Sequence, residues 1–206
     1  MTKHEKWLIW LEEEKNKDYY KAILKKLAEE EKNNLFTPDP EYRLRALEFS
    51  DIEKISLIIT ATKPIIEPYA ADGLAWSSLD SRVPTIYGLL YKKLYNELGI
   101  IYDQSDHSKE HWEKQGILLL NRELVAPVEK KAYNLFEDFT YNVLQYFLND
   151  NQRRAFLMLD EQCEWEVFSN PYNHLIVTEN IFSKKHIFNI ITSYLRSHCG
   201  VNIDWT

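Results

Sequence analysis

The sequence predicts an α/β fold: a single domain with a central four-stranded parallel sheet and helices on both of its faces. Three observations lead to this prediction. The chain has 206 residues, the length of one domain. Its short apolar runs are rich in aliphatic and β-branched residues, which is typical of strands buried on both faces. These runs alternate with segments of helical periodicity, and such alternation is characteristic of a parallel sheet.

The first segment, about residues 2–33, has helical periodicity. Its apolar side chains recur every three or four residues and share one face, whereas lysine and glutamate occupy the other. Pro38 and Pro40 follow and end the pattern. We therefore expect an N-terminal helical segment, residues 1–35, with a solvated outer face. Its apolar face consists of Tyr20, Ile23, Leu24, Leu27 and Ala28.

Strands and helices then alternate along the chain. The predicted strands are residues 55–60, 117–120, 155–159 and 174–177. The predicted helices are residues 85–98, 136–147 and 182–195. Ligands bind at the carboxyl ends of parallel strands, so the expected site lies in the loops at residues 61–77, 121–128 and 160–167. No internal repeat or low-complexity linker divides the chain, and we expect one domain over residues 1–206.

The composition excludes several classes of protein. No stretch approaches the roughly 18 consecutive apolar residues of a membrane span. Cys163 and Cys199 have neither the spacing nor the histidine neighbours of a zinc site, and no phosphate-binding glycine loop is present. We therefore expect no metal and no cofactor. Two free thiols and the lack of a signal-peptide pattern indicate a cytoplasmic protein, and we expect a monomer.

The formal net charge is −7, from 25 basic and 32 acidic residues. Residues 1–35 are neutral, so the acidic excess lies in residues 36–206. A protein that coats nucleic acid needs a net basic surface. The charge therefore favours a narrow basic patch or a protein partner over strong, general DNA binding.

Several segments resemble the motifs of one family, in the same order. Residues 61–77, ATKPIIEPYAADGLAWS, resemble a loop with the pattern GQDPYHGPxQAxGLAFS, and residues 112–121, WEKQGILLLN, resemble WAKQGVLLLN. Residues 136–140, 179–186 and 202–205 resemble WExFT, RGFFGxxHF and PIDW. These are motifs of the family 1 uracil-DNA glycosylases, and the resemblance covers nearly the whole chain. It implies the α/β fold of that family, whose members flip a uracil out of DNA and break its N-glycosidic bond.

The same correspondence shows where the chain departs from the family. The carboxylate that orients water and faces the cationic sugar corresponds to Lys63. The family's tyrosine and adjacent histidine correspond to Ile65 and Ile66, and an ungapped count back from residues 179–186 places Pro171 at the catalytic histidine. At about 4 Å and an effective dielectric constant near 20, one unit charge is worth about 4 kcal/mol. A cation in place of the carboxylate would therefore lower the rate by several powers of ten, and we predict that no catalytic residue remains and that the protein is not an enzyme.

Two positions of the base pocket are retained. The resemblance implies that Asn121 is the asparagine that reads the uracil edge and that Trp76 replaces the phenylalanine that stacks on the base. Each has a second interpretation, because an asparagine also caps loops and the larger tryptophan also fills an emptied pocket.

The remaining correspondences describe a groove for DNA or for a partner protein. Thr85 corresponds to a serine that contacts phosphate, and threonine is also a suitable N-cap. Leu175 corresponds to the leucine that enters the gap left by the flipped base, and it is equally suited to the core. The full groove set is Thr85, Tyr172, Asn173, His174, Leu175, Lys184 and Lys185.

We therefore expect a pseudoenzyme that acts by binding. One partner is a DNA-mimicking inhibitor protein of the glycosylases, for which an inactive relative would be a decoy or regulator; the other is DNA, bound weakly through the remnant groove. The alternative is a working glycosylase of altered specificity, whose catalytic residue has moved to Glu67, Asp72 or His174, or in which Lys63 forms a Schiff base.

Overall fold

The computed structural model describes residues 1–49, 51–67, 69–80, 85–101, 103, 107–128, 133–159 and 170–206. The helices in these ranges are α1 (Lys3–Asn16), α2 (Asp18–Glu30), α3 (Thr85–Leu98), α4 (Glu110–Lys114), α5 (Glu137–Leu148) and α6 (Ile187–Tyr194). The strands are β1 (Phe36–Thr37), β2 (Leu57–Ala61), β3 (Ile117–Asn121), β4 (Ala126–Pro127), β5 (Ala155–Leu159) and β6 (Leu175–Glu179). Single 3₁₀ turns lie at residues 40–42, 45–47 and 52–54, and a π-helical turn follows α6.

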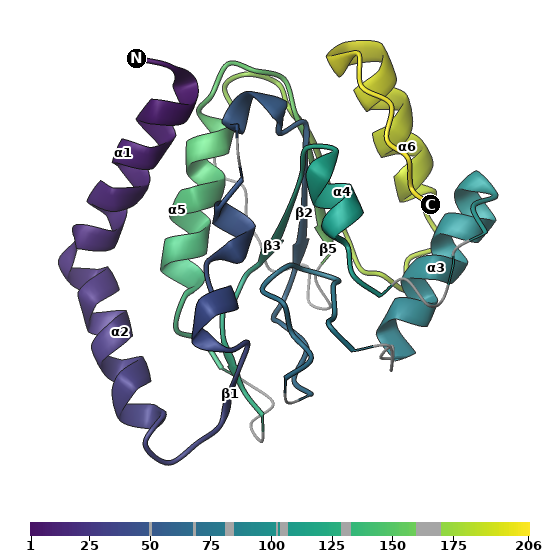
Figure 1. Ribbon diagram of the computed structural model, residues 1–206. Coiled ribbons are helices and arrows are strands. Elements are labelled where there is room, and N and C mark those ends of the chain that lie inside the picture. Colours follow the sequence, from purple (N-terminus) through teal and green to yellow (C-terminus); the bar gives the residue numbers. More distant parts are fainter. Residues whose placement is uncertain are drawn as a thin grey trace.

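Four parallel strands form the central sheet in the order β3-β2-β5-β6, which confirms the predicted fold class (Figure 1). The strands β2, β3 and β5 are buried over their whole length, whereas the edge strand β6 is half-buried. Burial on both faces explains why these strands read as continuous apolar runs in the sequence. A small separate sheet pairs β1 with β4 in antiparallel orientation.

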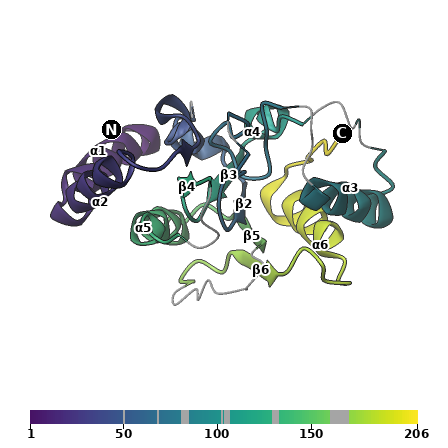
Figure 2. The same cartoon turned by 90° about the horizontal axis from the view of Figure 1, so that it is seen from below.

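Helices cover both faces of the sheet (Figures 1 and 2). On one face α5 lies against the sheet with α1 and α2 outside it, and on the other face α3 and α6 pack together. The side chain of Trp7 in α1 is fully buried. Its ring lies 5.3, 5.1 and 5.5 Å from the rings of Phe49, Tyr146 and Phe147. These aromatic contacts attach α1 to α5.

The N-terminal helical segment is two helices rather than one. The first, α1, begins at a capping box in which Thr2 and Glu5 accept from each other's backbone N–H groups. It ends where Lys17 becomes extended, with a ψ of 151°. The carboxylate of Glu14, 1% exposed, accepts from the Lys17 ammonium at 2.6 Å and from the Tyr19 hydroxyl of α2 at 2.5 Å. These contacts stabilise the break between the helices.

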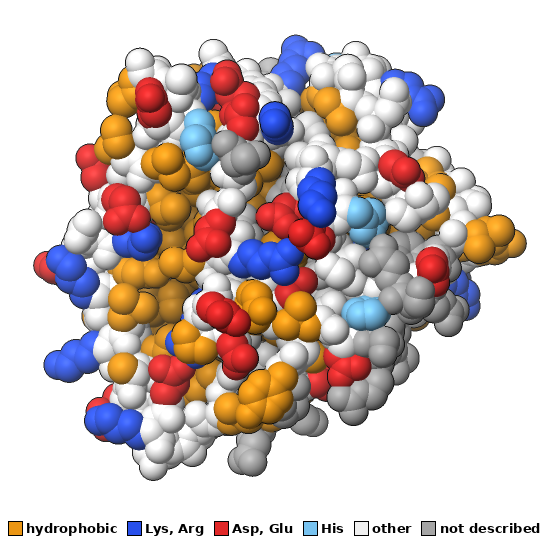
Figure 3. Space-filling view, in the orientation of Figure 1, with side chains coloured by type: hydrophobic (Ala, Val, Ile, Leu, Met, Phe, Trp, Pro, Cys, Tyr) orange, Lys and Arg blue, Asp and Glu red, His pale blue; other side chains and the backbone are white. Residues whose placement is uncertain are grey.

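Acidic and basic side chains are interspersed on the face drawn in Figure 3, with no broad basic area. This distribution agrees with the charge argument against general coating of DNA. Among the described residues, no helix is both long and apolar enough to cross a membrane.

Candidate functional site

The carboxyl ends of β2 and β3 are covered by the loop of residues 62–77. Past the end of the strands, the Glu123 N–H donates to the Thr62 carbonyl at 3.0 Å. Further along the loop, the Ala75 N–H donates to the Leu119 carbonyl of β3 at 3.1 Å. The loop therefore leaves β2, turns, and folds back onto the edge from which it came, which is where parallel sheets bind ligands.

Trp76 and Asn121 both lie at this edge. Trp76 is 8% exposed, and its indole N–H donates to the Thr60 carbonyl of β2 at 3.0 Å. Asn121 is 1% exposed and ends β3 in register with Ala61, the last residue of β2. Its amide Oδ1 is buried and has no hydrogen-bond partner among the described residues. Leaving such a group unsatisfied costs about 1–3 kcal/mol, which a ligand's N–H donor would offset.

The backbone of Trp76 is in the left-handed region, with a φ of 63°. A bulky residue rarely adopts this conformation, and such strain tends to occur at functional loops. The Trp76 ring lies 6.3 Å from the ring of Tyr87 in α3, and the Tyr87 hydroxyl donates to the Ser77 carbonyl at 2.8 Å. The tryptophan is thus held on both sides rather than free to move.

The degenerate positions lie in the same loop. Lys63, Ile65 and Ile66 are half-buried, and Ile65 packs against the core. Glu67 follows them directly and is exposed. A cation, two aliphatic side chains and a carboxylate thus lie in succession beside the end of β2.

Asp72 is not available for chemistry. Its side chain is fully buried, and it pairs with Arg45 at 3.1 Å. It also accepts from the Ser77 hydroxyl at 2.6 Å and from the Leu74 N–H at 3.1 Å. The carboxylate therefore fixes the turn of the loop.

His174 lies before the amino end of β6, whereas Asn121 lies at the carboxyl end of β3, on the other side of the sheet. His174 directly precedes β6, whose carboxyl end is Glu179. Its ring accepts from the Arg154 N–H at 3.2 Å and contacts the Leu148 carbonyl at 3.2 Å, and burial lowers its pKa. Pro171, Tyr172, Asn173 and Leu175 lie at the same amino edge. The structure therefore does not bring these residues to the carboxyl edge where Trp76 and Asn121 lie, because the ungapped count assigned them to a segment that comes before β6 and not after it.

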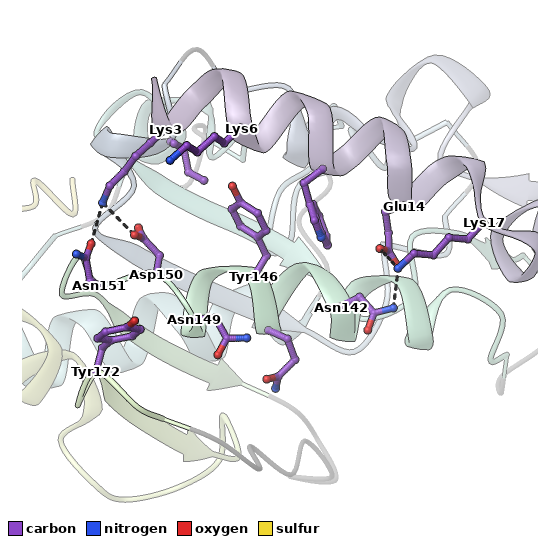
Figure 4. Close-up of a pocket in the computed structure, with 13 residues that line it drawn as sticks. Lys3, Lys6, Glu14, Lys17, Asn142, Tyr146, Asn149, Asp150, Asn151 and Tyr172 are labelled. Carbon is purple, nitrogen blue, oxygen red and sulfur yellow. Dashed lines mark hydrogen bonds and ion pairs between the residues drawn. The ribbon is translucent and has the colours of Figure 1, made fainter. Parts of the chain in front are cut away.

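Tyr172 lines a cavity of about 610 Å³ formed with α1 and α5 (Figure 4). In this cavity the ammonium of Lys3 pairs with Asp150 at 2.9 Å, and Lys17 pairs with Glu14. In these ion pairs a carboxylate compensates the positive charge of each lysine. The cavity is separate from Trp76 and Asn121, none of whose atoms line it.

The loop that follows β6 is at the same carboxyl edge of the sheet as Asn121. An Asx turn forms it, in which the Phe182 N–H donates to Asn180 Oδ1 at 2.9 Å. The Phe182 side chain is 63% exposed. Lys185 pairs with Glu179, whereas the exposed Lys184 has no ion pair in the described part of the chain. Only one of the two predicted basic residues therefore carries uncompensated charge.

Lys93 of α3 holds this loop in place. Its buried ammonium donates to the carbonyls of Ser183 at 2.6 Å and Lys185 at 2.8 Å. It also pairs with Glu97 at 3.1 Å, and Glu97 accepts from the Phe188 N–H at the start of α6 at 2.7 Å. One ion pair on α3 thus fixes both the loop and the helix after it.

Glu123, a buried carboxylate beside the site, was not singled out from the sequence. It is 4% exposed, and its Oε2 accepts from the backbone N–H groups of Leu135 and Phe136, both at 2.9 Å. Its Oε1 has no hydrogen-bond partner among the described residues. Burial raises the pKa of Glu123 to about 7, against the two backbone hydrogen bonds. An acidic residue three positions after the apolar run of residues 117–120 is the signal that could have revealed it.

Some predicted residues cannot be placed. Thr85 begins α3, but its side chain lies outside the described residues, as do residues 160–169 of the third predicted loop, with Cys163. Among the described residues, no group of three His, Cys, Asp or Glu side chains could hold a metal ion.

Known proteins resemble this chain in sequence and in fold. No protein-family model matches it. A uracil-DNA glycosylase of Oceanobacillus iheyensis is 32% identical over 218 residues, covering 97% of this chain and 93% of the relative. One of Mycoplasmopsis pulmonis is 31% identical over 170 residues, covering 80% of this chain and 76% of the relative. The mimivirus uracil-DNA glycosylase structure has a TM-score of 0.78 at 18% identity, covering 100% of this chain and 87% of that one. A substituted form of the mimivirus enzyme in complex with UGI also has a TM-score of 0.78.

The parallel sheet and its loops define a fold of the uracil-DNA glycosylase type. The chain belongs to the uracil-DNA glycosylase family. The prediction that the protein is not an enzyme is contradicted, because its relatives across many species are named uracil-DNA glycosylases. The argument that a cation at Lys63 abolishes catalysis assumes that the catalytic carboxylate must act from this position. It does not apply if another group performs the role of the carboxylate.

Proposed function

We propose that this protein is an active, divergent DNA glycosylase of altered specificity with a relocated catalytic residue. The observation that carries the proposal is the buried Oδ1 of Asn121 at the carboxyl end of β3, which no described residue hydrogen-bonds. An amide oxygen in that state is suited to accept a hydrogen bond from an N–H on the edge of a flipped-out base. Trp76 adds a fixed aromatic surface beside it. Ile65 takes the place of a tyrosine in the family pattern. Because this replacement changes the wall of the pocket, the pocket would admit bases other than uracil.

The relocated carboxylate in this proposal is Glu67. The sequence offers three candidates. Of these, Asp72 is held in an ion pair with Arg45, and His174 lies before the amino end of β6, away from the carboxyl edge. Glu67 is exposed in the loop that covers the carboxyl edge. A carboxylate there would orient the attacking water and stabilise the positive charge that develops on the sugar.

Lys63 takes a complementary role in the proposal. The departing base carries negative charge in the transition state, and an ammonium stabilises an anion as effectively as a carboxylate stabilises a cation. The half-buried Lys63 would therefore act by stabilising the negative charge on the leaving base, and not by opposing the positive charge on the sugar. The alternative Schiff-base route predicts a covalent intermediate between Lys63 and the sugar, which borohydride would trap.

Single-turnover release of bases from oligonucleotides tests the proposal. The substrates are single- and double-stranded DNA with uracil or other modified pyrimidines, and the wild-type protein should leave abasic sites. Glu67→Gln should lower the rate at least about 100-fold, as is typical for loss of an acid or base, whereas Glu13→Gln on the exposed face of α1 should not change it. No release of any base with protein in excess over DNA would refute the activity. An unchanged rate in Glu67→Gln would refute the assignment of the carboxylate alone.

We also propose a DNA-mimicking inhibitor as a protein partner that competes with DNA. UGI is bound to the mimivirus enzyme, whose fold is similar. The exposed Phe182 and the uncompensated Lys184 offer an apolar contact and a positive charge at the carboxyl edge. Addition of UGI should block base release and displace labelled DNA. Retention of full DNA binding in a saturating excess of UGI would contradict this partner.

A further inference from the structure

A second cavity, of about 440 Å³, opens at the amino edge of the sheet, opposite the base pocket. It lies between the residues that lead into β2, β3 and β5 and the turn that follows α6. Lys54, Ser56, Lys114, Gln152, Arg153 and His198 are among the residues that line it. We propose that this cavity is a binding site for a phosphate group, separate from the site of base excision.

The charge of the cavity is positive although the chain as a whole is acidic. Lys54 and Arg153 are exposed and have no ion pair among the described residues. Lys114 pairs with Glu110 at 3.3 Å, but both side chains are more than half exposed, so this pair contributes little. Among the described residues, Glu53 is the one carboxylate that lines the cavity. Three cations therefore face one anion in a protein whose net charge is −7.

Ser56 gives the cavity a buried donor that lacks a partner. The residue is 4% exposed, and its Oγ has no hydrogen-bond partner in the described part of the chain. Its backbone is fixed on both sides, because its N–H donates to the Gly116 carbonyl at 3.0 Å and its carbonyl accepts from the Ala155 N–H at 3.0 Å. The hydroxyl is thus held between the first residues of β3 and β5. A buried polar group without a partner indicates a missing acceptor.

The backbone around the cavity is built for this close arrangement. Gly116 has a φ of 85°, and a Cβ at this position would lie 2.1 Å from the Lys54 carbonyl oxygen. Only glycine permits this approach, and the approach brings the segments of Lys54 and Lys114 together. The cations are therefore gathered by a specific turn and not by chance exposure.

A phosphate group has an acceptor oxygen for each of these donors. A guanidinium, an ammonium and a hydroxyl can each donate to a different oxygen of one tetrahedral anion, and such charge-assisted hydrogen bonds are the strongest in proteins. The phosphate could belong to a free nucleotide or to the backbone of DNA. The two sources share the chemistry proposed here, and the experiment separates them.

The test measures the thermal midpoint of unfolding at increasing phosphate, with sodium chloride as the reference at equal ionic strength. A ligand of the folded state raises the midpoint progressively, with the logarithm of its concentration once this exceeds Kd. Arg153→Gln should weaken phosphate binding at least about 10-fold, and Ser56→Ala several-fold, because each removes a donor to the anion. Lys26→Gln, an equal loss of charge on the exposed face of α2, is the matched control and should bind as the wild type does. The midpoints without phosphate show whether each variant folds.

Two results would overturn the proposal: a shift no larger in phosphate than in chloride, or equal phosphate binding by Arg153→Gln, Ser56→Ala and the wild type.

Where phosphate binds, a competition experiment identifies the molecule that supplies the phosphate group. A nucleoside monophosphate that competes with phosphate supports a free nucleotide, and a short unmodified duplex that competes supports the DNA backbone. Binding of phosphate that neither displaces supports inorganic phosphate as the ligand. Because base release is not the readout, failure of this proposal is distinct from failure of the glycosylase activity.

Discussion

Substitution Glu123→Gln should remove a pH-dependent cost to folding that arises at the carboxyl edge of the sheet, just after β3. Burial raises the pKa of Glu123 from 4.5 to about 7. The folded protein therefore binds this proton more tightly than the unfolded chain does. Below pH 4.5 the carboxyl is protonated in both states and the cost is absent; as pH rises from 4.5 to about 7 the free energy of unfolding falls, and above pH 7 the full cost remains.

The magnitude follows from the two pKa values. At about 1.4 kcal/mol for each pH unit, the interval from 4.5 to about 7 corresponds to about 3 kcal/mol. Solvent screening is small, because the residue is 4% exposed. Glutamine keeps an oxygen that can accept from the N–H groups of Leu135 and Phe136, but it does not titrate. The variant should therefore gain up to about 3 kcal/mol relative to the wild type between pH 5 and pH 8.

Urea unfolding of both proteins at pH 5, 6, 7 and 8 measures this difference. Acidic groups elsewhere titrate in both proteins and cancel in the comparison. Glu13→Gln, at an exposed position of α1, should give a curve parallel to that of the wild type. The reasoning is wrong if the wild type and Glu123→Gln remain parallel over this range, since the buried carboxyl would then have an ordinary pKa.

Three further predictions concern other parts of the molecule. Gly116→Ala should destabilise the fold by at least about 2 kcal/mol, measured by urea unfolding, because it strains a φ of 85° and puts a Cβ 2.1 Å from the Lys54 carbonyl oxygen; an unchanged midpoint would contradict the close approach. Asp150→Asn should cost about 3 kcal/mol, also by urea unfolding, because it removes the carboxylate that lies 2.6 Å from the fully buried guanidinium of Arg154. Lys184→Gln should reduce the slope of log binding constant against log salt by about 1 if this residue contacts a DNA phosphate, and an unchanged slope excludes the contact.

The fold was predictable because its strands are apolar on both faces. β5 coincides with the predicted residues 155–159, and β2, β3 and β6 differ from the predicted ranges by one or two residues at their ends. The apolar face of residues 20–28 does not continue through α1, whose buried residues Trp7, Leu11 and Glu14 are out of helical phase with those of α2. The division of the N-terminal segment was nonetheless not predicted. It depends on the extended backbone of Lys17 and the contacts of Glu14, both tertiary features.

The site was only partly predictable from the sequence. Asn121 and Trp76 were singled out because their strand and loop keep the family's spacing, and their role in binding a base stays a prediction. His174 and Leu175 were assigned to the groove by an ungapped count back from residues 179–186, and the register of β6 puts them at the amino ends of the strands. The state of Glu123 depends on what buries it, and burial by residues 135–136 is not visible from its neighbours in the sequence.

The hold of Lys93 on the loop after β6 has a consequence for how this surface can change. The contacts run from a side chain on α3 to main-chain carbonyls 90 or more positions away, and main-chain carbonyls are present whatever residues the loop contains. The backbone conformation of the loop therefore does not depend on which side chains the loop carries. Residues at its tip, Phe182 and Lys184 among them, can be exchanged for others suited to a different partner while the backbone that presents them stays rigid. A surface built in this way can acquire new recognition without a new scaffold.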